Sequence, residues 1–117
     1  MPLLTVYTSA PPLADDKAHA LLKKLSASAS EILGKPERVF MTCIVPRTQM
    51  TFGGSTEPAC AVEIKSIGGL AGEGAKRLTE AVCRLVHEGT GVAMNRIFVV
   101  CTDVPGALWG HNGSTFG

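Results

Sequence analysis

The feature that most constrains the fold of this chain is its division into two halves with the same pattern. In each half an apolar segment of strand character precedes a helical pattern and a second apolar segment. A shift of 58 residues places Asp15 on Glu73 and the segment Arg38–Phe40 on Arg96–Phe98. The sequence therefore predicts one domain, residues 1–117, made of two β-α-β pseudo-repeats at about 1–52 and 58–117.

The spacing of apolar residues predicts where the helices and strands lie. Apolar residues at three- and four-residue intervals predict one helix from near Leu13–Asp15 to Gly34, and a second from about Glu73 to Glu88. Apolar runs bounded by glycine and proline predict four strands: Leu3–Thr8, Arg38–Val45, Cys60–Ile67 and Asn95–Thr102. A turn is predicted at Asn112-Gly113 in the glycine-rich tail.

Two right-handed β-α-β crossovers place both helices on one face of a four-stranded mixed sheet, which is an α+β fold. The second and fourth strands are apolar on both faces, although the helices can cover only one face. The uncovered face therefore needs another subunit, and the sequence predicts an oligomer.

Charge and composition exclude several classes of function. A net charge of +1 leaves no basic stripe for nucleic acid. No apolar run approaches the length of a membrane span, and no leader is recognisable, so we expect a cytosolic protein without membrane contact. Neither cysteines nor histidines stand at the spacing of metal ligands, so we expect no metal or cofactor and four reduced thiols: Cys43, Cys60, Cys83 and Cys101.

Pro2 is the residue with the most distinctive chemistry. Initiator methionine is normally removed before a small residue, and its removal would leave Pro2 as a free secondary amine at the start of a strand. A free α-amine has a pKa of roughly 8, which an apolar pocket or a nearby cation lowers. Such an amine is a general base or a nucleophile. The alternative interpretation is that this proline only begins a strand at a position needing no ladder N–H.

Six short segments, in order along the whole chain, resemble the macrophage migration inhibitory factor and D-dopachrome tautomerase family of the tautomerase superfamily. These segments are Met1-Pro2 with its strand, Gly34-Lys35-Pro36, residues 50–58, Ser66–Gly69, Asn95–Phe98 and Asn112–Phe116. The resemblance implies a homotrimer with three sites at subunit interfaces. It also implies that Pro2 is the base for keto–enol tautomerisation of α-keto acids such as phenylpyruvate.

The resemblance further assigns residues around Pro2. Lys35 matches the lysine that binds the substrate carboxylate and lowers the proline pKa, although a lysine here also suits a helix C-terminus. Ser66 and Ile67 match the segment that lines the pocket beside the proline. Apolar wall positions are matched by Leu3, Val39 and Phe116.

This chain also departs from the family pattern. Phe98 and Val100 stand where tyrosine and asparagine are frequent, so hydrogen bonds from a neighbouring subunit are missing and turnover of phenylpyruvate should be modest. His111 stands at a usual tryptophan position, with Trp109 two residues earlier, and Lys65 replaces a frequent histidine and adds charge near the pocket rim. The C-x-x-C of a proposed thiol oxidoreductase activity is absent.

Two classes of function follow. Retention of Pro2, Lys35 and Ile67 favours an isomerase of the phenylpyruvate tautomerase type. Loss of polar groups at Phe98 and Val100 favours a cytokine-like or chaperone-like interaction protein with a vestigial pocket. For such a protein the family resemblance allows unconventional secretion and a protein receptor. A third interpretation, decarboxylation or dehalogenation on the same proline, has no residue that selects it.

Overall fold

The two central strands of the sheet show the alternation expected of strands with one covered face. The computed structural model describes residues 1–117, and in it every second residue of β1 (Pro2–Thr8) and of β3 (Cys60–Ser66) is buried. The two strands are antiparallel, with pairing that runs from Pro2↔Ser66 to Thr8↔Cys60. The chain therefore begins at one end of the centre of the sheet.

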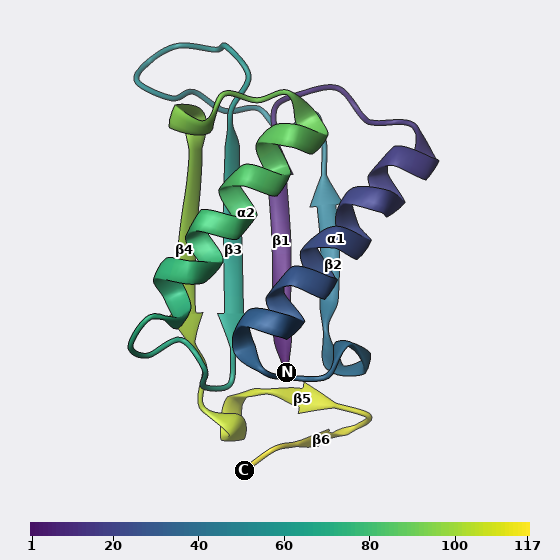
Figure 1. Ribbon diagram of the computed structural model, residues 1–117, viewed down its shortest axis with the longest axis vertical. Coiled ribbons are helices and arrows are strands. Elements are labelled where there is room, and N and C mark those ends of the chain that lie inside the picture. Colours follow the sequence, from purple (N-terminus) through teal and green to yellow (C-terminus); the bar gives the residue numbers. More distant parts are fainter.

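The edges of the sheet are formed by the second strand of each half. β2 (Met41–Val45) is parallel to β1, and β4 (Ile97–Asp103) is parallel to β3, which gives the order β2-β1-β3-β4. Both helices lie on the same face of this sheet (Figure 1). The predicted α+β fold with a mixed four-stranded sheet is confirmed.

The helices bury one apolar stripe each against the sheet. α1 (Asp15–Leu33) and α2 (Gly74–Thr90) end at glycines with left-handed backbones, Gly34 with φ 65° and Gly91 with φ 77°. The two helices approach closely at Gly89, where a Cβ atom would lie 2.9 Å from Leu21 Cδ1. The core between helices and sheet contains Leu21, Leu25, Ala29, Leu78, Val82 and Val86 from the helices, and Leu4, Val6, Val62 and Ile64 from the strands. No helix is long and apolar enough to cross a bilayer.

The edge strands begin later than the sequence predicts. Short 3₁₀ turns, η1 (Glu37–Val39) and η2 (Met94–Arg96), occupy the predicted starts of β2 and β4. In each turn the residue that follows donates its N–H to the carbonyl of the first turn residue: Phe40 to Glu37 at 2.9 Å, and Ile97 to Met94. Neither turn contains a buried residue.

The strand register corrects the alignment of the two halves. Leu3 pairs with Met41, and Ala61, 58 residues after Leu3, pairs with Phe98. Met41 therefore corresponds to Phe98, so the second strands of the two halves are related by a shift one residue shorter than the shift between the first strands. The predicted match of Phe40 with Phe98 is wrong. Exposure agrees with the register, because Met41 and Phe98 are 65% and 62% exposed.

The face of the sheet opposite the helices is uncovered in this chain (Figure 1). It presents large apolar side chains from both edge strands: Met41, Val45, Phe98 and Val100. Apolar patches of this kind mark interaction surfaces more often than free surfaces. The observation agrees with the sequence argument that this face needs a covering subunit.

The tail lies beyond the end of the sheet at which β1 begins (Figure 1). After the turn η3 (Gly106–Leu108), a small hairpin is formed by β5 (Gly110–His111) and β6 (Ser114–Thr115). Positive φ angles of 52° at Asn112 and 79° at Gly113 define the predicted tight turn. The hairpin residues are all exposed, whereas Trp109 just before them is half-buried.

Candidate functional site

The first residues of β1 are fixed at the end of the sheet. The Pro2 side chain is fully buried, and its strand partner is Ser66. The Ile67 N–H donates to the Met1 carbonyl oxygen at 3.4 Å, which extends the pairing by one residue. The amino terminus therefore cannot move without breaking contacts with the end of β3.

Lys35 reaches the same place from the end of α1. Gly34 ends the helix in a left-handed conformation, and the chain turns so that Lys35 points toward β3. Its Nζ donates to the Ile67 carbonyl at 2.5 Å, to Ser66 Oγ at 3.2 Å and to the Gly68 carbonyl at 3.5 Å. All three partners are neutral, and no carboxylate pairs with this ammonium group, since the salt bridge of the structure joins Arg84 and Glu88.

The loop that receives Lys35 is held from its other side by Asp103. The Gly68 N–H donates to Asp103 Oδ1 at 2.9 Å, and Ser66 Oγ donates to the Gly68 carbonyl at 2.7 Å. Gly68 and Gly69 have φ angles of 71° and 85°, which favour glycine. Asp103 ends β4 opposite Ser66, so the parallel register brings its carboxylate to this loop.

The charge and burial around the amino terminus change its acidity. Burial lowers the pKa of the Met1 amino group, which is the free amine of this structure, below its ordinary value of 8.0, and the Lys35 ammonium lowers that pKa further. Both effects disfavour the protonated form. A larger fraction of this amine is therefore neutral at pH 7 than of an exposed amino terminus.

A cavity of about 560 Å³ opens beside this amine. Leu3, Val39 and Trp109, which the sequence predicts as site residues, line it together with Pro2. Its wall contains no acidic residue and is completed by Met1, Arg38, Phe40, Met41, Gly110 and His111. The structure therefore brings four of the predicted residues to one cavity, with Lys35, Ser66 and Ile67 at the adjoining strand end.

Two other predicted residues lie near this cavity but outside its lining. Lys65 lines a second cavity of about 390 Å³, which shares Leu3, Trp109 and Gly110 with the first. Phe116 stacks on His111 with 6.2 Å between ring centroids, so it reaches the first cavity only through that ring.

Phe98 and Val100 lie away from Pro2 within one chain. Phe98 pairs with Ala61, near the opposite end of β3 from Ser66, and its ring contacts Phe52 at 4.9 Å between centroids. Both side chains are exposed on the uncovered face of the sheet. Only a neighbouring subunit could bring them to a site at Pro2, so their predicted role stays a prediction.

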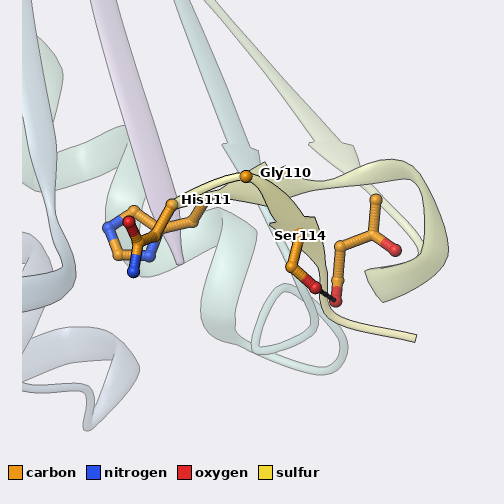
Figure 2. A pocket seen from close by; sticks show the side chains of 6 residues that line it. Gly110, His111 and Ser114 are labelled. Carbon is orange, nitrogen blue, oxygen red and sulfur yellow. Dashed lines mark hydrogen bonds between the residues drawn. The ribbon is translucent and has the colours of Figure 1, made fainter.

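A third hollow, of about 590 Å³, lies against the tail hairpin. Figure 2 shows that the residues that line it come from the hairpin alone, with His111 and Ser114 on different sides. No apolar side chain lines it, and its one internal side-chain bond is a 3.4 Å contact from Ser114 Oγ to the Thr115 carbonyl. Without converging charged groups this hollow is the concave side of a protruding hairpin.

The four thiols take no part in the cavity beside Pro2. Cys60 is buried, the other three are half-buried, and all four are unpaired. Burial raises the pKa of the thiols of Cys60, Cys83 and Cys101, so these groups stay protonated at neutral pH.

Sequence reasoning missed three residues around the amine: Arg38, Asp103 and the cavity-lining role of His111. Arg38 was treated as part of a strand, whereas the η1 turn directs it to the cavity. The one signal in the sequence that could have identified Arg38 as a site residue is its position three residues after Lys35.

The fold consists of two β-α-β units with both helices on one face, and the start of the chain is held beside a lysine. These features define a protein of the tautomerase superfamily. The family model described as "Macrophage migration inhibitory factor (MIF)" matches residues 1–117. The chain belongs to this family.

Individual relatives agree with the family match. A solved structure of a macrophage migration inhibitory factor homologue from Prochlorococcus marinus superposes with a TM-score of 0.94 at 45% identity, covering 98% of this chain and 99% of that one. Macrophage migration inhibitory factor of Xenopus laevis is 32% identical over 99% of both chains. A homolog from Trichuris trichiura is also 32% identical, over 99% of this chain and 100% of its own length.

Proposed function

We propose that this protein is a keto–enol tautomerase that acts on α-keto acids such as phenylpyruvate, with the Pro2 amine as the base after removal of Met1. The observation that carries the proposal is the Lys35 ammonium group beside the chain's amino group. This cation is bound by neutral oxygens only, and it adds to the effect of burial in lowering the pKa of the Met1 amino group, one residue before Pro2.

The proposed reaction moves one proton within the substrate. The neutral Pro2 nitrogen removes a proton from the carbon next to the keto group, and the electrons of the broken C–H bond form the C=C bond of the enol. The keto oxygen gains the negative charge and then accepts the proton from the proline. The same steps in reverse convert enol to ketone, and no electron leaves the substrate.

Lys35 would hold the substrate carboxylate by a charge-assisted hydrogen bond. An ammonium group has three donors, and Lys35 directs them at three oxygens of residues 66–68. The 3.5 Å contact with the Gly68 carbonyl is the longest of these, so a carboxylate can replace it at little cost. The other two contacts would keep Nζ in place during the reaction.

We also propose that the active protein is a homotrimer. The uncovered apolar face of the sheet and the exposed tail, with Leu108 76% exposed, both support burial against other copies. In the trimer Phe98, Val100, Lys65 and Phe116 would complete the sites of neighbouring subunits, as the family resemblance implies. Sedimentation should report about three times the chain mass of 12.2 kDa, and a stable monomer at micromolar concentration would contradict the assembly.

The test of the base is a pair of variants. Pro2→Gly, and a variant with alanine inserted between Met1 and Pro2, should keep the oligomer and lose activity by about 10²- to 10⁴-fold, the usual contribution of a general base. Intact mass of the wild-type chain should show Met1 removed. Wild-type rates in either variant would place the base elsewhere.

The second candidate is an interaction protein with a vestigial pocket. It is favoured by Phe98 and Val100, which are apolar and exposed where a polar contribution to the site was expected. A mature wild-type chain that starts at Pro2 and shows no tautomerisation of any α-keto acid would select this candidate.

A further inference from the structure

Arg38 lies at the wall of the cavity that contains Pro2. It is the central residue of η1, and the turn is closed by bonds from Val39 N–H to the Pro36 carbonyl and from Phe40 N–H to the Glu37 carbonyl, at 3.2 and 2.9 Å. Arg38 is the third residue after Lys35, and Pro36 between them restricts the backbone at the start of the turn. The position of Arg38 is therefore set by backbone geometry.

The guanidinium group of Arg38 has no partner in the protein. It takes part in no salt bridge and in no side-chain hydrogen bond, and the adjacent Glu37 carboxylate accepts a bond from Ser26 Oγ at 3.1 Å instead. Arg96 shows the contrast: its guanidinium contacts four carbonyl oxygens of the loop before β3, with Pro58 and Glu57 at 2.9 and 3.0 Å. Arg96 is used by the fold, whereas Arg38 is free for a ligand.

The rest of the cavity gives Arg38 a defined role. Its wall is apolar at Leu3, Val39, Phe40, Met41 and Trp109 and has no acidic residue. Lys35 supplies one cation at the adjoining end of β3, and Arg38 supplies another in the wall of the cavity itself. An arginine with all its donors free binds a carboxylate with two parallel hydrogen bonds.

We infer that the substrate of this site carries a second carboxylate, so that it is an α-keto dicarboxylic acid whose far carboxylate is held by Arg38. This inference rests on the proposed function and narrows its substrate class. Lys35 holds the carboxylate next to the keto group, and the chain between the two carboxylates lies against the apolar wall. A phenyl ring in the same place leaves the Arg38 guanidinium without a partner.

The kinetic test compares two substrates in matched variants. The enol forms of oxaloacetate and phenylpyruvate are followed by loss of their ultraviolet absorbance as they convert to ketones. Arg38→Gln should raise KM for oxaloacetate about tenfold or more and change KM for phenylpyruvate less than twofold, with kcat retained for both. Arg38→Lys, which keeps the charge but loses the paired donors, should lie between. Arg84→Gln, on the surface of α2, is the control and should change neither.

A binding measurement separates this inference from the proposed function. Malate and phenyllactate are unreactive hydroxy-acid counterparts of the two substrates, and calorimetry with the mature protein should show tighter malate binding, with the preference lost in Arg38→Gln. If the wild type converts neither enol but shows this preference, the proposed function fails and the inference on Arg38 stands. Equal affinity for both acids, or equal KM changes for both substrates in Arg38→Gln, would overturn the inference.

Discussion

After its capping glycine α1 continues into Lys35, and after its own capping glycine α2 continues into Val92. The two residues occupy corresponding positions of the two halves, yet Val92 is 1% exposed in the core and Lys35 extends to the end of β3. One half therefore closes its β-α-β unit with an apolar side chain. The first half has no apolar side chain at this position and instead extends the Lys35 ammonium group toward the second half.

The ends of the two central strands differ in the same way. Thr8 and Ser66 end β1 and β3, and both are buried. Thr8 Oγ1 donates to the Ala59 carbonyl at 3.2 Å and accepts from the Ala10 N–H, so its bonds stay within the backbone. Ser66 Oγ accepts from Lys35 Nζ. A repeated fold thus gains a site where the halves stop being alike: the first half supplies the amine and the cation, and the second supplies the polar loop.

The largest effect that would test this comparison is expected at Val92. Val92→Lys places an ammonium group in the core, and its desolvation should cost several kcal/mol, a large part of the about 5–15 kcal/mol that stabilises a domain. Denaturant unfolding should find the variant largely unfolded, while Val92→Ala should lose about 1–3 kcal/mol. A Val92→Lys protein with wild-type stability would show that the two positions are equivalent.

The opposite substitution at Lys35 should affect activity more than folding. Lys35→Ala should lower kcat/KM for α-keto acids about ten- to a hundredfold, because a charge-assisted bond of about 1.5–3 kcal/mol is lost. Stability should fall by only a few tenths to about 1 kcal/mol, through the lost cation near a helix C-terminus. An ester of the substrate should be nearly indifferent to the change. Equal losses for acid and ester would remove Lys35 from the site and favour the interaction protein.

The pH profile should sharpen the role of the first half. Burial and Lys35 both lower the pKa of the Met1 amino group, and in the mature chain we expect the same two effects to lower the pKa of the Pro2 amine below 8.0. The value of kcat/KM should therefore rise with pH through this pKa and then level off. In Lys35→Ala the inflection should move to higher pH, since a neighbouring cation is gone. An inflection at or above 8.0 in the wild type would contradict the pocket effect.

The smallest effect is expected at Asp103, whose counterpart at the end of β2 is Pro46, a residue without a carboxylate. Asp103→Ala removes the acceptor of the Gly68 N–H and should lower kcat/KM about two- to tenfold, since a single hydrogen bond contributes about 0.5–1.5 kcal/mol. Asp103→Asn keeps an acceptor oxygen and should retain most of the activity. If the two variants lose equally, the carboxylate acts by its charge and not by holding the loop.

The fold was predictable because local signals agree with it. Alternating burial in the central strands, apolar stripes on the helices and Gly34 are all visible in the sequence. The boundaries of the edge strands were not, because η1 and η2 run directly into the apolar strand residues that follow them, and no glycine or proline separates turn from strand. Lys35 and Pro2 came together through family resemblance, since no spacing rule relates them.

The rest of the site depends on register. Asp103 reaches Gly68 because β3 and β4 are parallel and in step, a relation that no short segment of sequence contains. Arg38 was hidden by the assignment of its turn to a strand. Lys65 was placed at the rim by analogy, but alternation along β3 directs it to the second cavity, on the other side of Leu3 and Trp109.

The pairing of Pro2 with Ser66 has a consequence for the order of events during synthesis. Pro2 is buried once β3 has paired with β1, so under the proposed function we expect the aminopeptidase to act before this pairing. At about 5–20 residues per second, synthesis of the chain up to Ser66 takes roughly 3–13 s, so that pairing cannot occur earlier. In a chain that folds with Met1 still attached, the Met1 carbonyl accepts a hydrogen bond from the Ile67 N–H, which ties this residue to the end of β3. Under the proposed function, a chain that keeps Met1 has an amide where the mature chain has the proline amine, so Met1 removal would decide which folded chains are active.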